Sequence, residues 1–244
     1  MKIYPHVAQG SDAWMKLRLG RPTASEFHRV VTPKKCDLSA QAHSYALRLV
    51  AERLLNMPMT EGIASAWMER GKELEASAAQ QYEFEQDVTA FPVGFITTDD
   101  GTLGCSPDRL VLGEQRRAVE IKCPAPHVHL GYLLDGTNDD YKPQVQGQIL
   151  VAELERADLY SYHPQMPPAL VSTVRDADYA AKLELALKKF VGTLADLFDR
   201  AQKLGAYQSI ARSAAAPEAI EADALARQFA KETTARMIAE GFTA

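Results

Sequence analysis

The chain has 244 residues, 46% of them hydrophobic and 24% charged, a composition that suits a globular protein with an ample core. Apolar runs fall short of the ~20 residues that span a membrane, and the first residues lack the apolar stretch of a signal peptide. The three cysteines lack the spacing of a zinc ribbon or a disulfide framework. We therefore expect a cytoplasmic protein. The net charge is −5, but residues 1–60 hold nine Lys and Arg against four Asp and Glu, whereas residues 61–100 hold two against nine. This division suits a phosphate-binding rim beside a carboxylate site, and it equally suits an uneven surface.

Three short helices are expected in the first sixty residues. Ser11 can cap a helix that carries Arg18, because a serine hydroxyl at the N-cap accepts a hydrogen bond from a free helix N–H group. The stretch Thr23–Glu26 has the Thr-x-x-Glu pattern of a capping box, and Ser39 can cap a third helix. A longer helix fits residues 64–86, which are rich in Ala, Glu and Gln.

The sequence after residue 87 predicts a mixed α/β core. Helices are expected over 141–154 and 178–204, where apolar residues recur with helical periodicity. Together with the N-terminal helices, this order predicts one domain over 1–204 with a mixed central sheet flanked by helices and an N-terminal helical layer. The Ala-rich tail over 205–244 is expected to be a helical extension beginning near residue 216. The expected strands cover residues 88–98, 103–106, 109–112, 118–123, 157–163 and 169–174.

The clearest chemical pattern joins a turn to the strand that follows it. Asp108 comes directly after a proline at the turn, and Glu120 and Lys122 lie twelve and fourteen residues later. Because side chains alternate along a strand, Glu120 and Lys122 point to one face, which Asp108 can also reach, and Ile121 points to the other. Carboxylates are hard ligands suited to Mg²⁺ or Mn²⁺, and the Ile121 carbonyl can complete the coordination. Lys122, kept protonated by these carboxylates, can orient water or stabilise charge at a phosphodiester.

This pattern also fits an ordinary surface strand, where Glu and Lys two positions apart are common. Three observations favour the metal site. The acid lies on a proline-bounded turn, the expected helix before it offers further carboxylates, and the helix after it offers uncharged side chains suited to phosphate or water. These residues are Glu69, Glu73 and Glu75 on the first helix and Gln144, Gln146 and Gln148 on the second.

Several stretches together resemble one known family, the lambda-type alkaline exonucleases, also described as the YqaJ viral recombinase family of the PD-(D/E)xK nuclease superfamily. The resemblance covers roughly residues 8–200, and the matches occur in the family's order with similar gaps. It implies a restriction-endonuclease-like PD-(D/E)xK core. The matching stretches are Gln9–Gly20, Thr23–Glu26, Gly71–Glu75, Cys105–Asp108, Glu120–Pro124 and Tyr141–Gln146.

The resemblance implies roles for the residues of the metal site. Asp108 and Glu120 would be metal ligands together with the Ile121 carbonyl, and Lys122 would be the catalytic lysine. Glu75 would be the helix-borne catalytic acid near a second metal position. The expected cofactor is Mg²⁺, with Mn²⁺ as a substitute.

The resemblance also implies a pocket for the 5′-phosphate of the strand being degraded, formed by Arg18, Ser25, Ser106 and Gln144, with Tyr141 beside it. The chemistry of these residues agrees with that role. The Arg18 guanidinium is a planar fork that matches a phosphate. Ser25 lies in the first turn of an expected helix, where backbone N–H groups favour anions.

The family's activity gives a specific expectation for this chain. It implies 5′→3′ digestion of one strand of linear double-stranded DNA to mononucleotides, which leaves 3′ single-stranded DNA for recombination. It further implies a homotrimeric ring, a single-strand annealing protein as partner, and a phage or prophage gene in a bacterial host. The tail over 205–244 departs from the family pattern and leaves the partner contacts open.

Other functions fit parts of the sequence. A PD-(D/E)xK endonuclease would share the metal site, but it would not be expected to carry the N-terminal block around Arg18. An iron–sulfur exonuclease of the superfamily needs four cysteines, and this chain has three. A non-catalytic DNA-binding recombination scaffold would not need the intact set of Asp108, Glu120 and Lys122.

Overall fold

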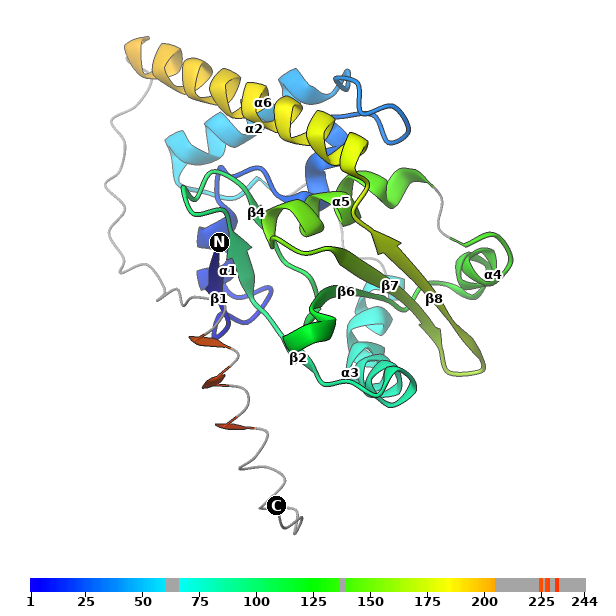
Figure 1. Ribbon diagram of the computed structural model, residues 1–244. Coiled ribbons are helices and arrows are strands. Elements are labelled where there is room, and N and C mark those ends of the chain that lie inside the picture. The colour runs from blue at the N-terminus through cyan, green and yellow to red at the C-terminus, as the bar shows by residue number, and fades with distance from the viewer. Residues whose placement is uncertain (60–65, 137–138, 205–223, 226, 229–230, 233–244) are drawn as a thin grey trace.

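A five-stranded sheet and a three-stranded sheet form the centre of the protein, and helices surround them (Figure 1). The computed structural model describes all residues except 60–65, 137–138, 205–223, 226, 229–230 and 233–244. The mixed α/β class predicted from the sequence is confirmed. Strand β6 lies third in the larger sheet, between β5 and β7, so its side chains are covered on both faces.

The larger sheet has the order β2-β5-β6-β7-β8 and contains one parallel pair, β6 with β7, among antiparallel neighbours. The pairing of β5 with β6 places Arg109 opposite Val119, so the residue before β5 comes close to the middle of β6. The sheet's strands are β2 (Ala90–Pro92), β5 (Arg109–Val111), β6 (Arg117–Lys122), β7 (Arg156–His163) and β8 (Met166–Val174).

The smaller sheet corrects one predicted strand. The segment expected to be extended over 88–98 divides at Val93-Gly94 into β2 and β3, which belong to different sheets. Gly94 fits the close approach there, because a Cβ atom would lie 1.9 Å from the Val7 carbonyl oxygen. The sheet has the order β1-β3-β4, with β1 (Lys2–Tyr4), β3 (Phe95–Thr97) and β4 (Gly104–Cys105).

The N-terminal helical layer confirms one predicted cap and corrects two. The Ser11 hydroxyl accepts a hydrogen bond from the Trp14 N–H group at the start of α1 (Asp12–Arg18), as predicted. Thr23 precedes the 3₁₀ helix η1 (Ala24–Arg29), but its side chain forms no capping hydrogen bond. Helix α2 (Ala42–Leu55) has Gln41 as its N-cap instead of Ser39.

Three of the remaining helices pack on the larger sheet, and the last one packs on other helices. Helix α4 was not predicted: Pro126 stands in its first turn, where the missing N–H group breaks no hydrogen bond. Short 3₁₀ turns lie at η2 (Gly113–Gln115) and η3 (Asp139–Tyr141). The longer helices are α3 (Ala66–Gln86), α4 (Pro126–Asp135), α5 (Lys142–Val151) and α6 (Ala177–Lys203).

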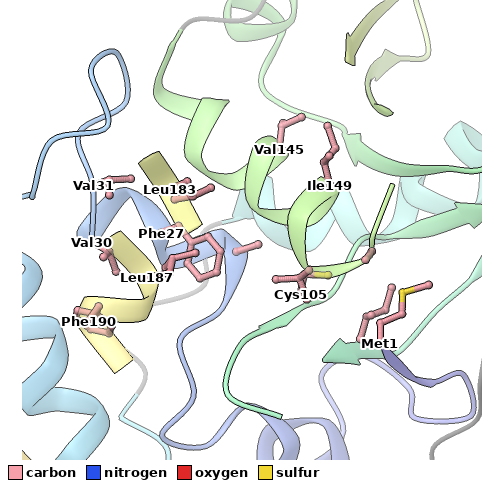
Figure 2. Close-up of a cluster of buried hydrophobic side chains, with 14 of the residues drawn as sticks. Met1, Phe27, Val30, Val31, Cys105, Val145, Ile149, Leu183, Leu187 and Phe190 are labelled. Carbon is pink, nitrogen blue, oxygen red and sulfur yellow. The ribbon is translucent and has the colours of Figure 1, made fainter. Parts of the chain in front are cut away.

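The main hydrophobic core joins the helical layer to the sheets (Figure 2). Gly147 of α5 packs so closely on Phe27 of η1 that a Cβ atom would lie 2.5 Å from the ring. This contact brings the helix that carries Gln144 beside the 3₁₀ helix that carries Ser25. Further core side chains come from α5 and α6, namely Val145, Ile149, Leu183, Leu187 and Phe190.

Most of the predicted helical extension lies outside the described residues. Within it, the few residues that are described between 224 and 232 are helical, and the side chain of Leu225 is buried with the main core. In the part of the chain that the structure covers, no helix combines the length and apolar character needed to cross a membrane.

Candidate active site

The register of β5 and β6 brings Asp108, Glu120 and Lys122 together, as their spacing predicted. The Ile121 backbone N–H group donates a 2.7 Å hydrogen bond to Asp108 Oδ2. Lys122 Nζ donates to Glu120 Oε1 at 2.7 Å, since both side chains leave the same face of β6. Two carboxylates and one ammonium group therefore meet at the end of a central strand.

Helix α5 completes the surroundings of Glu120. This side chain is only 8% exposed, and its Oε1 and Oε2 atoms also accept hydrogen bonds from Gln144 Nε2 at 2.8 Å and Gln148 Nε2 at 2.7 Å, respectively. The Gln148 Oε1 atom is buried, and no hydrogen-bond partner for it exists among the described residues. A buried acceptor without a protein partner fits a site that holds water or a hydrated cation.

The electrostatics of the site favour a bound cation. Burial, reinforced by the charge of Glu120, raises the pKa of Asp108 to about 8, so the carboxyl holds its proton unless another positive charge replaces it. Burial opposes the charge on Lys122, but Glu120 and Asp108 outweigh it and raise the pKa of the ammonium group. Lys122 is thus protonated in the resting site.

The donor set fits a hard divalent ion. No cluster of three or more His, Cys, Asp or Glu side chains able to hold a metal occurs within the described ranges. Two carboxylates suit Mg²⁺, which keeps several of its waters and needs few protein ligands. Ile121 is fixed beside Asp108 through its N–H group, and the ligand role of its carbonyl stays a prediction.

Glu75 of α3 lies beside the site but already has a partner. Arg109 Nη1 donates to Glu75 Oε1 at 3.0 Å and to the Asp108 carbonyl oxygen at 2.8 Å. Glu75, Asp108 and Arg109 line a groove of about 450 Å³ together with residues 5–9 and 92–94. Glu73 is exposed, and the side chain of Glu69 lies outside the described residues.

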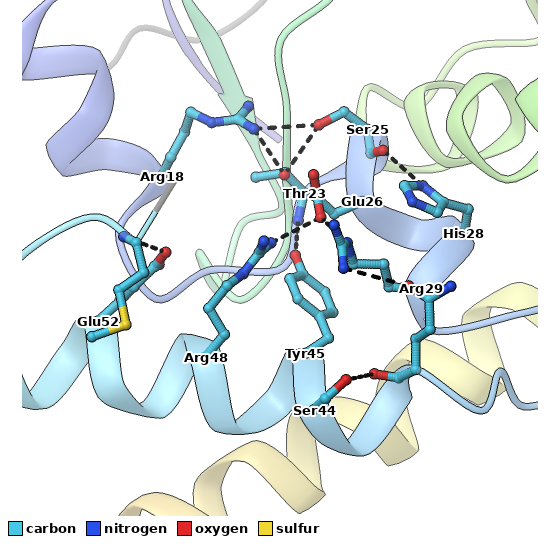
Figure 3. Close-up of polar contacts among 12 residues, drawn as sticks. Arg18, Thr23, Ser25, Glu26, His28, Arg29, Ser44, Tyr45, Arg48 and Glu52 are labelled. Carbon is cyan, nitrogen blue, oxygen red and sulfur yellow. Dashed lines mark hydrogen bonds and ion pairs between the residues drawn. The ribbon is translucent and has the colours of Figure 1, made fainter. Parts of the chain in front are cut away.

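Arg18 and Ser25 form a second polar cluster in the helical layer (Figure 3). Arg18 Nη2 donates to Thr23 Oγ1 at 3.2 Å and to Ser25 Oγ at 3.3 Å. The guanidinium carbon lies 4.3 Å from the centre of the Trp14 ring, in a cation–π contact. Burial lowers the pKa of Arg18. The two hydroxyls that Arg18 contacts are neutral and leave its charge uncompensated, whereas the charges of Glu26 and Glu52 act to raise its pKa.

Trp14 connects this cluster to the carboxylate site. Its Nε1 atom donates to Ser106 Oγ at 2.9 Å, while its ring lies against Arg18. The Cys105 thiol is buried, and burial and the charge of Glu120 raise its pKa, whereas Arg18 acts to lower it. Trp14 therefore links the arginine cluster to the short segment that ends at Asp108.

The predicted phosphate pocket is assembled in part. Arg18 and Ser25 are in contact and Ser106 is linked to them through Trp14, but Gln144 is hydrogen-bonded to Glu120 on the metal side. Tyr141 is the N-cap of α5, and the centre of its ring lies 6.2 Å from that of Tyr132. It also contributes to the raised pKa of Lys122.

Gln146, also suggested by the sequence, has a structural role. Its side chain donates to the Val174 carbonyl and accepts from the Asp176 N–H group, and so fixes the start of α6 to α5. Of the three glutamines of α5, Gln144 and Gln148 therefore belong to the site.

Sequence reasoning missed several polar residues of the site. Thr23 was interpreted only as a helix cap, yet it contacts Arg18. Arg29 and Arg48 both pair with Glu26 Oε2, at 2.6 and 2.8 Å, beside Arg18 in a pocket of about 150 Å³. The positive charge of residues 1–60 was the signal for these arginines.

A mixed sheet whose central strand carries Glu120 and Lys122 beside Asp108 defines a PD-(D/E)xK-type nuclease fold. The model of the YqaJ-like viral recombinase domain matches residues 13–155, so the chain belongs to this family of alkaline-exonuclease-like nucleases. The family resemblance and the fold inferred from the sequence are thereby confirmed. No curated protein sequence matches the chain.

Solved structures agree with this assignment. The alkaline exonuclease LHK-Exo from Laribacter hongkongensis is similar with a TM-score of 0.71 and 28% identity, over 80% of this chain and 98% of that one. The same enzyme in complex with dAMP gives a TM-score of 0.70, with the same identity and coverage. A phage-related exonuclease from Haemophilus somnus 129PT shares the fold, with a TM-score of 0.58 and 15% identity over 74% of this chain and 96% of that one.

Proposed function

We propose that the protein is a Mg²⁺-dependent exonuclease that degrades one strand of linear double-stranded DNA 5′→3′ from a 5′-phosphate. It would release mononucleotides and leave 3′ single-stranded DNA for recombination by strand annealing. One observation carries the proposal. The Arg18 guanidinium and the Ser106 hydroxyl both contact Trp14, and Ser106 lies two residues before Asp108 of the carboxylate site, so a terminal phosphate and the next phosphodiester of one strand can be held together.

The carboxylates of Asp108 and Glu120, with the Ile121 carbonyl, would hold the metal. When bound, Mg²⁺, or Mn²⁺ in its place, supplies a more acidic water and neutralises charge on the phosphodiester. Gln144 and Gln148 fix the orientation of Glu120 through their amide hydrogens. Lys122, protonated and 31% exposed on its side chain, orients the attacking water and stabilises the developing negative charge.

The terminal phosphate would be held in the helical layer. The Arg18 fork donates charge-assisted hydrogen bonds to its oxygens, and Ser25 and Ser106 offer hydroxyls on either side. Trp14 keeps Arg18 and Ser106 in place. The complex of LHK-Exo with dAMP supports a mononucleotide as product.

The family supports further proposals about assembly and context. We propose a homotrimeric ring around duplex DNA, a single-strand annealing protein as partner, and a phage or prophage gene expressed in the cytoplasm of a bacterial host. Light scattering tests the ring, and a strictly monomeric species would contradict it.

The activity is tested by following end-labelled DNA with Mg²⁺ and with EDTA. Linear duplex with a 5′-phosphate should be digested fastest, the 5′-hydroxyl duplex more slowly, and a closed circle not at all. Nicked circles show whether an internal 5′-phosphate also serves as a starting point. Cleavage of closed circles would indicate an endonuclease, and DNA that is bound but never degraded would indicate a scaffold.

A further inference from the structure

Arg109 is a charged residue of the site for which the sequence pattern gave no role. It begins β5 directly after Asp108, and its guanidinium lies between the Glu75 carboxylate and the Asp108 carbonyl oxygen, at 3.0 and 2.8 Å from Nη1. Its side chain is 17% exposed, whereas that of Glu75 is 36% exposed. The arginine is therefore the more buried member of the pair, and it lies against the backbone of Asp108.

A second metal ion at this position would need the Glu75 carboxylate as a ligand. A carboxylate that binds a metal ion must turn an oxygen toward it, and the guanidinium holds Glu75 Oε1, which leaves Oε2 for an ion. An ion bound there would also lie near the fixed positive charge of Arg109, and two like charges a few ångströms apart repel strongly in a partly buried site. The backbone carbonyl of Asp108 is engaged by the same nitrogen.

We propose that Arg109 takes the place of a second metal ion, so that each chain binds a single metal ion, at Asp108 and Glu120, and Glu75 serves to position the arginine. The inference rests on the proposed metal-dependent nuclease activity. It assigns Glu75 as a positioning residue and removes it from the metal ligands.

The test counts Mn²⁺ ions bound per chain by titration with electron paramagnetic resonance detection of free Mn²⁺, without DNA. The wild-type chain should bind one ion. Arg109→Ala exposes Glu75 and should bind a second, weaker ion, which the double variant Arg109→Ala/Glu75→Gln should lose. Arg109→Lys keeps the positive charge and should bind one.

Three controls separate the possible failures. Arg116→Ala removes a positive charge whose guanidinium donates to the Glu153 carbonyl, away from the site, and it should leave the count at one. Glu75→Gln alone should also bind one ion with an affinity within about twofold of wild type. Glu75→Gln and Arg109→Lys test the inference even if Arg109→Ala does not fold. Circular dichroism would show whether it folds.

Two ions on the wild-type chain, loss of an ion in Glu75→Gln, or a single ion on folded Arg109→Ala would each overturn the inference while leaving the nuclease proposal intact. Absence of any Mn²⁺ binding by the wild-type chain would overturn both.

Discussion

Trp14 and Ser106 link the arginine cluster around Arg18 to the carboxylate site around Glu120, yet the charges of the two regions are compensated in different ways. Glu120 is almost fully buried and accepts hydrogen bonds from three side chains, one of them a cation. Arg18 donates to two neutral hydroxyls and rests on an aromatic ring. The first site can accept a cation and the second can accept an anion. A metal ion bound together with a DNA strand would supply both charges.

The largest effect is expected from the carboxylate site. Asp108→Asn and Lys122→Ala should each lower the rate of digestion by at least ~100-fold, because they remove a metal ligand and a charge that acts on the reacting phosphodiester. The rate is measured on linear duplex with a 5′-phosphate, and circular dichroism should show folded proteins. Full activity in either variant would contradict the assignment of the site.

The next largest effect should distinguish the arginine cluster from the carboxylate site. Arg18→Ala should slow digestion from 5′-phosphorylated ends by ~10- to 100-fold, the value of one or two charge-assisted hydrogen bonds, and affect 5′-hydroxyl ends much less. Both substrates are compared in parallel with Arg116→Ala as the control. Equal losses on both ends would remove Arg18 from the phosphate pocket.

The dependence of metal binding on pH tests the carboxylate site separately from the arginine cluster. Burial and Glu120 raise the pKa of Asp108 to about 8 in the metal-free protein, above its value of 3.8 in the unfolded chain. The stability that the protonated carboxyl contributes is therefore fully present below pH 3.8 and is lost as the pH rises through about 8. Mg²⁺ must displace this proton below pH 8.

The increase in melting temperature that Mg²⁺ causes should therefore grow between pH 6 and about 8 and level off above. Differential scanning fluorimetry measures it at each pH. Asp108→Asn cannot titrate and should flatten the profile; an unchanged profile in that variant would show that another group is responsible.

The smallest effect is expected from Thr23. Thr23→Val keeps the shape of the side chain and removes the hydroxyl that Arg18 contacts, which should lower the rate on 5′-phosphorylated ends by ~5-fold, about 1 kcal/mol for one neutral hydrogen-bond partner. The 5′-hydroxyl duplex serves as the comparison. A loss as large as that of Arg18→Ala would mean that Thr23 contacts the substrate itself.

Features that depend on neighbours in the sequence could be predicted. Ser11 caps α1 because the cap involves residues three apart. Asp108, Glu120 and Lys122 converge because alternation along a strand and a hairpin register fix their positions.

Features set by contacts between separate helices and strands could not be predicted. Thr23 matches a capping box, but Arg18 takes its hydroxyl. The family resemblance implied a place for Gln144 in the phosphate pocket, but α5 directs its side chain to Glu120. The role of Arg109 depends on α3, which places Glu75 within hydrogen-bond distance of it; an arginine at the start of a strand has no such signal in the sequence.

One measurement tests most directly whether the two regions act on one strand. A linear duplex carries a 5′-phosphate at one end and a 5′-hydroxyl at the other, with a different label on each 5′-terminal nucleotide, and is digested with Mg²⁺. We predict that the label at the phosphorylated end is released first, as a mononucleotide, and that Arg18→Ala removes the difference between the ends. Equal release from both ends by the wild-type protein, or release from the 3′ ends, would contradict the account.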